Sequence, residues 1–464
     1  MFNISQPNLP TTYKKRARAM NPTPLTRQKK SIYPSHLLGL LFLLCNSIAY
    51  AGIEHTTVMA LSGDIESGYP TNESRDFLIS DFMSKNTFKY WSANRYTVVN
   101  RLSPAKQNQI TRFVESELPE VSQNSKSVIY LFGGPDSVYP NLFFPNLEKL
   151  YLVGLEDVGR LPQVDKKEDL IQYANELGKA FMSLPYRSYF VTRSMAQQLK
   201  QHGVVTVAAV GLVSIGYKIE NIAYLDVTES GELYEDENSH RGVRIDYLKP
   251  NGSEASLYYF QQNLGPDEYD GLPGYKQDRR VIDHLEAQNF DTAFYKAASY
   301  APYLKDLFKV VNALVTENVD YVVQTDSGLK DNEFSDNEWD RVLFGQYTIP
   351  NLSYSIMKNF QQPELQSAFD QGICDSSDKK AQSQLKKLRG DNKVCDSVKS
   401  NLLGVTWKGL LPFRYGYASH LTGPTMGTGR GAPADDTPTN ACGTATKREC
   451  KSYANHLLVY KRRK

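Results

Sequence analysis

The sequence predicts an α/β protein with a mixed, mostly parallel sheet flanked by helices. The first observation is a set of short, continuous apolar runs that stop at glycine or aspartate, such as Ser127–Phe132 and Tyr321–Gln324. Such runs are typical of strands that are buried on both faces, and those strands occur mainly in parallel sheets. The second observation is that longer segments with helical periodicity separate these runs, which is the alternation expected of an α/β fold. The chain has 464 residues, of which 41% are hydrophobic, so it can form a large core.

Residues 1–51 have the features of a secretory signal peptide. They contain seven basic side chains and no acidic one, and the apolar run Leu37–Leu44 leads into Ala49-Tyr50-Ala51, followed by Gly52. An apolar run before an A-x-A pattern is typical of a cleaved signal. The run is shorter than the roughly 18 to 20 residues that span a bilayer, which argues against a retained anchor. We therefore expect an exported bacterial protein, periplasmic or secreted, whose mature chain begins near Gly52.

The charge of the mature chain excludes a general attraction to nucleic acid. The whole sequence has 53 basic and 51 acidic side chains, and removal of the seven basic side chains of residues 1–51 leaves 46 against 51. A slightly acidic protein has no global field for a polyanion. No stretch of transmembrane length follows Gly52, so the mature protein is expected to be soluble. Its expected partner is a small molecule or an envelope component.

After the signal, the sequence divides into three parts. Residues 52–120 have a mixed, largely helical pattern and are expected to form a helical lead-in. Residues 121–360 are expected to form the α/β core domain. Residues 361–464 are polar and rich in lysine, glycine and proline, and they predict an irregular, loop-rich C-terminal region with two disulfides.

The expected elements of the core follow from these patterns. The dipeptide Asn251-Gly252, preceded by Pro250, separates two apolar segments and predicts a hairpin. The other apolar segments stop at glycine-containing turns, whereas the helical segments are longer and amphipathic. The expected strands are Ser127–Phe132, Leu150–Val153, Val243–Leu248, Leu257–Phe260 and Tyr321–Gln324, with further apolar segments at Val204–Leu212 and Ile219–Asp226; the expected helices are Glu168–Met182, Arg279–Ala287 and Ala293–Thr316.

The four cysteines after the signal predict two local disulfides. Their number is even, and an exported protein meets an oxidising compartment. The favoured pairs are Cys374–Cys395 and Cys442–Cys450, since each closes a short polar loop. In the chain-entropy description, such loops contribute about 2.5 to 3.5 kcal/mol each. The spacings do not match a zinc site.

Three carboxylates follow predicted strands directly and form the candidate site. Asp136 follows Gly-Gly-Pro, Glu156 follows Gly-Leu, and Asp326 precedes Ser-Gly. If the three strands are parallel neighbours, these side chains meet at one edge of the sheet, where α/β proteins bind ligands. Arg193 and Lys296 are the cations that could hold them or orient an anionic substrate. A carboxylate pair could act as general acid and base, or could bind a divalent cation such as Mg²⁺ or Ca²⁺ as the cofactor.

Other interpretations of these residues stay open. Aspartate beside glycine or serine is also ordinary turn and helix-cap chemistry. Lys296 and Ser299 are spaced i, i+3 and would share one face of the predicted helix as a Ser/Lys pair. The glycines near Asp136 lack the spacing of a dinucleotide-binding loop, and the histidines form no close pair, which leaves a histidine triad or a zinc hydrolase without support.

Several blocks resemble a family of uncharacterised bacterial exported proteins. The blocks are Gly133-Gly134-Pro135-Asp136, Gly154-Leu155-Glu156-Asp157-Val158-Gly159, Thr192-Arg193-Ser194-Met195, Lys296-Ala297-Ala298-Ser299-Tyr300 and Gln324-Thr325-Asp326-Ser327-Gly328. The resemblance covers roughly residues 55–360. It departs at Thr325, where a second aspartate is usual, so a role that needs adjacent carboxylates at 325 and 326 is in doubt. The resemblance implies export and a shared fold. It does not imply any particular activity, because the family has none assigned.

Two classes of function are consistent with these observations. The first is an exported hydrolase with a carboxylate-lined cleft at the strand ends. The second is a non-catalytic periplasmic ligand-binding or assembly protein that uses the same cleft. An enzyme is expected to place at least two of these carboxylates within about 10 Å of each other and within reach of a cavity, with a raised pKa on one of them. A binding protein does not need this arrangement.

Overall fold

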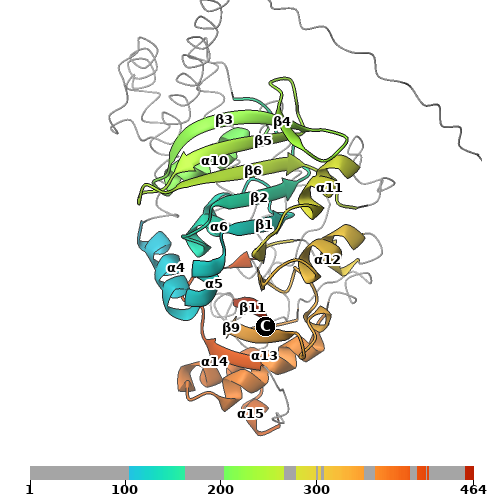
Figure 1. The fold of residues 1–464 in the computed structure, drawn as a ribbon. Coiled ribbons are helices and arrows are strands. Elements are labelled where there is room, and N and C mark those ends of the chain that lie inside the picture. The colour runs from blue at the N-terminus through green and yellow to red at the C-terminus, as the bar shows by residue number, and fades with distance from the viewer. Residues whose placement is uncertain are drawn as a thin grey trace, which may run out of the picture. The chain divides into compact units, whose positions relative to one another are not determined.

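A computed structural model describes residues 104–161, 203–265, 278–298, 301–304, 308–349, 361–397, 405–413, 415–416 and 455–464. These residues form an 11-stranded sheet with helices on both of its faces, which confirms the α/β class (Figure 1). The strand order is β10-β9-β11-β8-β7-β1-β2-β6-β5-β3-β4. All of these residues belong to one structural unit.

Five parallel strands form the centre of the sheet. They are β8 (Tyr321–Gln324), β7 (Thr292–Tyr295), β1 (Ser127–Leu131), β2 (Lys149–Gly154) and β6 (Glu254–Gln261), in that spatial order. Every residue of β7 and β8 is buried, as is nearly every residue of β1 and β2. Burial on both faces explains why β1, β2 and β8 have continuous apolar sequences.

Antiparallel pairs occur on both sides of this centre. They make up five of the ten strand pairs that the structure describes, so the sheet is mixed, as predicted, but not mostly parallel. Beyond β6 lie β5 (Gly242–Leu248), β3 (Lys218–Val227) and β4 (Leu233–Glu235). The predicted hairpin is confirmed, since β5 and β6 pair antiparallel around the turn that contains Gly252, whose φ is +83°. Beyond β8 lie β11 (His456–Arg462), which is antiparallel to both of its neighbours, then β9 (Trp339–Gly345) and β10 (Val405–Gly409).

Helices cover both faces of the sheet, so the core has two layers. One layer contains side chains of four helices: α4 (Pro104–Glu117), α5 (Pro119–Asn124), α6 (Val138–Phe143) and α10 (Val205–Ser214). The other contains side chains of α11 (Arg279–Glu286), α12 (Lys309–Thr316) and α13 (Pro363–Asp375). Figure 1 shows α4, α5 and α6 on one side of the strands and α11 and α12 on the other.

The prediction of an irregular C-terminal region is wrong for the residues that the structure describes there. The range 361–464 contains α13, α14 (Lys379–Arg389), α15 (Val394–Ser397) and two strands of the sheet, β10 and β11. Strand β11 is central to the fold, because it pairs with both β8 and β9. Its apolar residues Leu457–Tyr460 are at most 2% exposed. The prediction was wrong because it was based on the lysine- and glycine-rich composition of the whole region, in which this short apolar segment is a small part.

The predicted helix Ala293–Thr316 is also wrong in its first part. The described residues of that segment begin inside strand β7, form a short 3-10 helix at Ala301–Tyr303, and are α-helical from Lys309 to Thr316. A four-residue apolar run does not distinguish strand from helix by periodicity. Pairing with β1 and β8 decides the matter here. Similarly, the apolar segment Val204–Leu212 forms most of helix α10.

One predicted disulfide is confirmed. Cys374 and Cys395 are bonded and link α13 to α15. Cys442 and Cys450 lie outside the described residues, as do the predicted signal peptide, most of the predicted lead-in and the predicted helix Glu168–Met182. None of the helices that the structure describes is long and apolar enough to cross a membrane.

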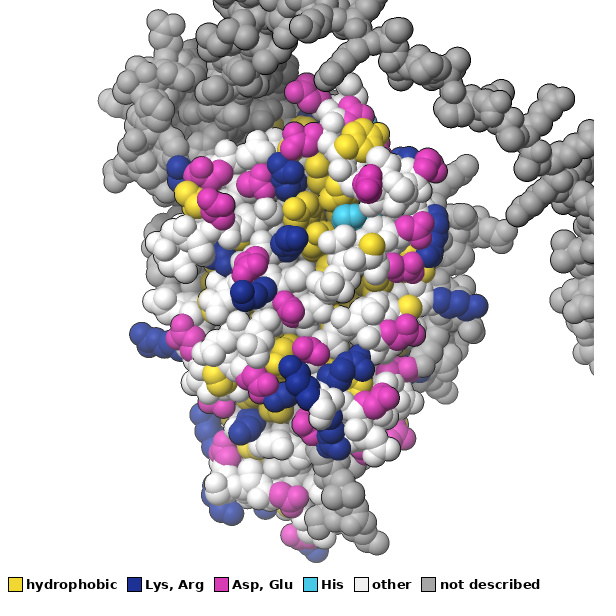
Figure 2. All heavy atoms as spheres, in the orientation of Figure 1, with side chains coloured by type: hydrophobic (Ala, Val, Ile, Leu, Met, Phe, Trp, Pro, Cys, Tyr) yellow, Lys and Arg dark blue, Asp and Glu magenta, His cyan; other side chains and the backbone are white. Residues whose placement is uncertain are grey.

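The surface visible in Figure 2 carries charges of both signs. Lysine and arginine side chains alternate with aspartate and glutamate over the strands and helices, and apolar side chains lie between them. No part of this face is dominated by one sign of charge.

Candidate active site at the carboxyl ends of the parallel strands

Four neighbouring parallel strands deliver ionisable side chains to one edge of the sheet. In spatial order, Asp326 follows β8, Lys296 follows β7, Asp136 follows β1 and Glu156 follows β2. The three carboxylates were predicted at the ends of parallel strands, and the sheet has that arrangement. Lys296 was predicted in a helix, so its place at a strand end is a correction.

The strand order reverses between β1 and β7. From β1, the chain passes through α6 on one face of the sheet to β2. From β7, it proceeds to α12 on the other face and then to β8, on the opposite side of β1. The connections after β1 and β7 therefore diverge to opposite faces. In α/β sheets, such a reversal creates the crevice in which ligands bind.

Asp136 and Lys296 meet at this reversal as a buried ion pair. The Nζ of Lys296 donates to Oδ2 of Asp136, and the two side chains are 0% and 1% exposed. Asp136 also accepts hydrogen bonds from the backbone N–H of Tyr139, at 3.3 Å, and from the hydroxyl of Tyr130, at 3.4 Å. The Nζ of Lys296 lies 3.3 Å from the centre of the Tyr139 ring, a cation–π contact.

Burial changes the acidity of Lys296. Removal from water lowers the pKa of its ammonium group to about 8, although the nearby Asp136 carboxylate acts in the opposite direction. A lysine with such a pKa can give up or accept a proton near neutral pH, which an ordinary surface lysine cannot do readily.

The turn after β1 has a conformation that favours glycine. Phe132 has φ +61° and is the one non-glycine residue with a positive φ among the described residues; Gly134 follows with φ +56°. A Cβ on Gly133 would lie 2.7 Å from the Tyr130 ring, so only glycine fits there. Strained backbone of this kind is concentrated at functional sites. The turn brings Asp136 back toward the end of β7.

Glu156 lies beside the same turn. A Cβ on Gly134 would be 3.4 Å from Oε1 of Glu156, which places the carboxylate against the turn after β1. The hydroxyl of Tyr259 donates to the backbone carbonyl of Glu156 at 2.7 Å and lies 3.3 Å from its Oε2. The residue is 5% exposed. Glu156 therefore connects the ends of β1, β2 and β6.

Asp326 is paired with a histidine that the sequence analysis did not select. Since β11 runs antiparallel to β8, its first residue, His456, lies at the carboxyl end of β8. The Nε2 of His456 is 3.1 Å from Oδ1 of Asp326 and 3.1 Å from the backbone N of Asp326. The two residues are 130 positions apart, and no local motif marks His456.

A second group from the C-terminal region covers the ends of β7 and β8. Asn455 donates to the carbonyl of Phe413 and accepts from the backbone N–H of Tyr415 at 2.9 Å, which fixes this short segment in place. Gly416 has φ +59°, and a Cβ there would lie 2.6 Å from the carbonyl oxygen of Lys296. The Tyr415 side chain is fully buried in the same layer as Tyr139.

Two other predicted features have a different outcome. Arg193 and Ser299 lie outside the described residues. Lys296 follows a strand, so its expected place on a helical face is wrong. Thr325, the position at which the resemblance predicted a departure, donates its hydroxyl to the carbonyl of Lys296 at 3.1 Å. Within the described ranges, no three His, Cys, Asp or Glu side chains are grouped as metal ligands.

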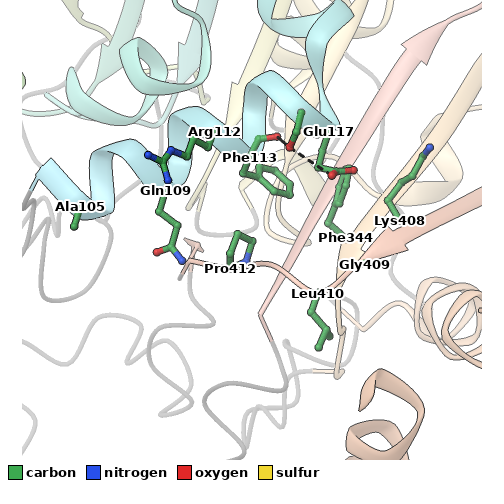
Figure 3. Close-up of a pocket in the computed structure, with 11 residues that line it drawn as sticks. Ala105, Gln109, Arg112, Phe113, Glu117, Phe344, Lys408, Gly409, Leu410 and Pro412 are labelled. Carbon is green, nitrogen blue, oxygen red and sulfur yellow. Dashed lines mark hydrogen bonds between the residues drawn. The ribbon is translucent and has the colours of Figure 1, made fainter. Parts of the chain in front are cut away.

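A separate open pocket of about 670 Å³ lies between α4 and the end of β10. Figure 3 shows Gln109 and Arg112 extending from α4, and Lys408 and Leu410 coming from the end of β10 and the residue that follows. Phe344 also lines the pocket. None of the predicted site residues that the structure describes lines it, so it is distinct from the strand-end site.

Comparison with family models, with curated proteins and with solved structures found no match to this chain. The resemblance to a family of exported proteins therefore stays a prediction.

Proposed function

We propose that this chain is an exported hydrolase whose reaction takes place at the carboxyl ends of β8, β7, β1 and β2. The observation that carries this proposal is the buried Asp136–Lys296 pair at the reversal of strand order. Ligands bind at such a reversal in α/β proteins, and buried ionisable groups with shifted pKa values are enriched in active sites.

The pair has the chemistry that hydrolysis by water requires. The carboxylate of Asp136 can accept a proton from an attacking water molecule, and the ammonium of Lys296 can donate one to the leaving group. Because burial lowers the pKa of Lys296 to about 8, it is a stronger acid than an ordinary lysine. The direct hydrogen bond between the two groups then returns the proton from Asp136 to Lys296, which resets the site.

The remaining charged groups have supporting roles in this proposal. Glu156 lies against the turn that carries Asp136 and helps to position that turn. Asp326 and His456 occupy the end of β8, on the other side of β7. The export part of the proposal rests on the signal-like residues 1–51 and agrees with the Cys374–Cys395 disulfide, since disulfides persist in oxidising compartments.

A non-catalytic binding protein is the second candidate. The observation that favours it is burial: Asp136, Glu156, Lys296 and Asp326 are at most 5% exposed, and each makes a contact with another protein group. In this case the charged pair would hold the shape of a ligand site, and no proton would be transferred.

The test compares two buried lysines. In the double variant Asp136→Asn/Lys296→Gln, two neutral side chains that can still hydrogen-bond replace the ion pair. The control is Lys249→Gln, since Lys249 is also buried but bonds to backbone carbonyls far from the site. Purified mature protein is assayed with chromogenic p-nitrophenyl esters, phosphates and glycosides. A hydrolase loses at least a hundredfold in rate in the double variant and little in the control.

Two results would oppose the proposal. If the wild-type protein hydrolyses none of these substrates, the catalytic proposal fails and the binding protein is favoured. If the double variant retains full activity while folded, as judged by circular dichroism, the Asp136–Lys296 pair is not the reactive group. Export is tested separately by N-terminal sequencing of the protein recovered from the periplasm or the medium, which should begin at or near Gly52.

A further inference from the structure

We infer that Tyr415 is a further substrate-binding residue of this site, and that its hydroxyl donates a hydrogen bond to the carbonyl oxygen of a carboxylic ester. This inference rests on the proposed hydrolase function and names its substrate class. Tyr415 belongs to the part of the chain that the sequence predicted to be loop-rich, and nothing in its local sequence marks it.

The first observation is an unsatisfied hydroxyl. Tyr415 is 0% exposed, and its hydroxyl has no hydrogen-bond partner among the residues that the structure describes. A buried donor without an acceptor is costly, and native proteins rarely keep one without a reason. Burial, together with the charge of Asp136 and the nearby Tyr139, raises the pKa of Tyr415 well above its usual value. The group therefore stays protonated and acts as a donor.

The second observation is the place of this hydroxyl relative to the ion pair. The ring of Tyr415 lies 6.4 Å from that of Tyr139, and the Nζ of Lys296 lies over the other ring at 3.3 Å. Lys296 in turn donates to Asp136, and Gly416, the residue after Tyr415, lies against the carbonyl of Lys296. A donor, a carboxylate and an ammonium group thus occupy one buried region at the strand-order reversal.

The third observation is that Tyr415 is held rigidly. The side chain of Asn455 hydrogen-bonds to the backbone carbonyl of Phe413 and to the backbone N–H of Tyr415. The neighbouring Gly416 packs tightly against the carbonyl of Lys296. The ring itself packs against Phe143 and Phe294, with centroids 5.4 and 6.1 Å away. A rigid donor is what stabilisation of a developing negative charge requires, because it needs no reorganisation during the reaction.

Tyr295 provides a contrast within the same molecule. Its hydroxyl is also fully buried and also has no partner among the described residues. However, its side chain packs in the core layer on the opposite face of the sheet, with α11 and α12. Burial alone raises its pKa, and no charged group contributes. Among the described residues, three buried tyrosine hydroxyls have no partner: Tyr295, Tyr347 and Tyr415. Tyr347 lies in the same layer as Tyr295, beside His456, so only Tyr415 lies in the layer of Tyr139 and the Asp136–Lys296 pair.

The chemistry of ester hydrolysis accounts for all three groups. Water attacks the carbonyl carbon and forms the new C–O bond, while its proton passes to Asp136 and the carbonyl oxygen becomes an oxyanion that accepts from Tyr415. The oxyanion re-forms the carbonyl, the bond to the alkoxide breaks, and Lys296 protonates the alkoxide. Asp136 then returns its proton to Lys296. Asp136, Lys296 and Tyr415 are at most 1% exposed, so this reaction requires the side chains that cover them to move when the ester binds.

The experiment compares Tyr415→Phe with Tyr295→Phe in the full mature protein, with p-nitrophenyl acetate as the probe. Both variants remove one unpartnered hydroxyl, so both are expected to unfold in urea at a midpoint no lower than that of the wild-type protein. Tyr415→Phe should lower kcat for the ester by at least tenfold with little change in KM. Tyr295→Phe should leave kcat within a factor of two.

The outcomes separate this inference from the proposed function. If the wild-type protein hydrolyses the ester and Tyr415→Phe is as active as Tyr295→Phe, the inference about Tyr415 is wrong and the hydrolase proposal stands. If the wild-type protein cleaves only a phosphate or a glycoside, the ester assignment is wrong and the hydrolase proposal again stands. If the wild-type protein cleaves none of these substrates, the hydrolase proposal and the inference about Tyr415 are both wrong, and no variant needs to be compared.

Discussion

Two lysines are buried at opposite edges of the same sheet, and they differ in what holds them. Lys296 follows β7 at the carboxyl edge and donates to the Asp136 carboxylate. Lys249 follows β5, whose last residue pairs with the first residue of β6, so it lies at the amino edge. Its Nζ donates to the backbone carbonyls of Pro145, at 2.8 Å, and Leu147.

The difference shows what burial alone cannot indicate. Burial lowers the pKa of both lysines to about 8. The carbonyl partners of Lys249 cannot take up a proton, and they belong to the chain that leads from α6 into β2, so Lys249 stabilises a connection. The partner of Lys296 can take up a proton, and it lies where the strand order reverses. The partner and the position, rather than the pKa, distinguish a candidate catalytic lysine from a structural one.

The largest expected effect comes from removal of one partner of the buried pair. Lys296→Met leaves the Asp136 carboxylate buried without its counter-ion and should lower the free energy of unfolding by about 3 to 5 kcal/mol. Lys249→Met leaves only neutral carbonyls without a donor and should cost about 1 to 3 kcal/mol. Urea unfolding at neutral pH measures both. The double variant Asp136→Asn/Lys296→Gln should recover most of the loss, and equal losses in the two single variants would contradict the comparison.

The pH dependence of stability should report both lysines together. Burial lowers their pKa in the folded protein from 10.5 to about 8, so between pH 8 and 10.5 the unfolded chain binds protons that the folded protein does not. The free energy of unfolding should therefore rise with pH across this window, by up to about 1.4 kcal/mol per pH unit for each lysine. Conversely, this stabilisation is lost as the pH falls through 8.

Variants assign the two contributions. Lys249→Met should remove one part of the rise and Asp136→Asn/Lys296→Gln the other. Urea unfolding between pH 8 and 9.5 is the appropriate measurement, because the buried tyrosines, such as Tyr247 and Tyr415, have raised pKa values and reduce stability at higher pH. A slope that both variants leave unchanged would show that the two lysines are not charged differently in the folded and unfolded states.

The parts of the fold that could be predicted from sequence are those with a local signal. Strands β1, β2 and β8 are continuous apolar runs that stop at Gly or Asp, and these signals gave both the strands and the carboxylates that follow them. The β5–β6 hairpin was predicted because Asn251-Gly252 marks its turn. Each of these features lies within about ten residues of the chain, and the same is true of the helix α11.

The parts that could not be predicted depend on pairing between distant segments. Strand β7 has only four residues, and Lys296 and two alanines follow it, a sequence that also suits a helix. Pairing with β1 and β8 makes this segment a strand. Tyr415 and His456 reach the site because β11 inserts between β8 and β9. No local pattern indicates such an insertion, so Tyr415 and His456 could not be predicted, whereas the carboxylates and Lys296 could.

Two glycines with positive φ extend the comparison of the two edges. Gly416, at the carboxyl edge, has φ +59°, and a Cβ there would meet the Thr325 side chain at 2.4 Å and the Lys296 carbonyl at 2.6 Å. Gly252, in the hairpin turn near Lys249, has φ +83° and no atom within 4 Å of such a Cβ. Gly252→Ala should cost only the backbone strain, about 1 to 2 kcal/mol. Gly416→Ala must also displace the segment that carries Tyr415, so it should cost more and reduce ester hydrolysis.

Thermal unfolding and p-nitrophenyl acetate hydrolysis measure these two glycine variants side by side. Equal stabilities of the two variants, with full activity in Gly416→Ala, would indicate that the segment carrying Tyr415 is not held against Lys296 in solution.

The smallest expected effect concerns the other charged pair of the carboxyl edge. Asp326→Asn keeps the size of the side chain, and the new amide can donate to Nε2 of His456, which lies 3.1 Å from Oδ1. Because a histidine can be neutral, this substitution does not leave a buried charge without a partner, as Lys296→Met does. The free energy of unfolding should therefore change by less than about 1 kcal/mol.

Ester hydrolysis shows whether Asp326 takes part in the reaction. A rate that falls tenfold or more in folded Asp326→Asn places Asp326 in the reaction, whereas an unchanged rate confines the chemistry to the ends of β1 and β7. A loss of stability as large as that of Lys296→Met would mean that Asp326 holds a charge whose partner is fixed and ionised, and the contrast between the two pairs would then fail.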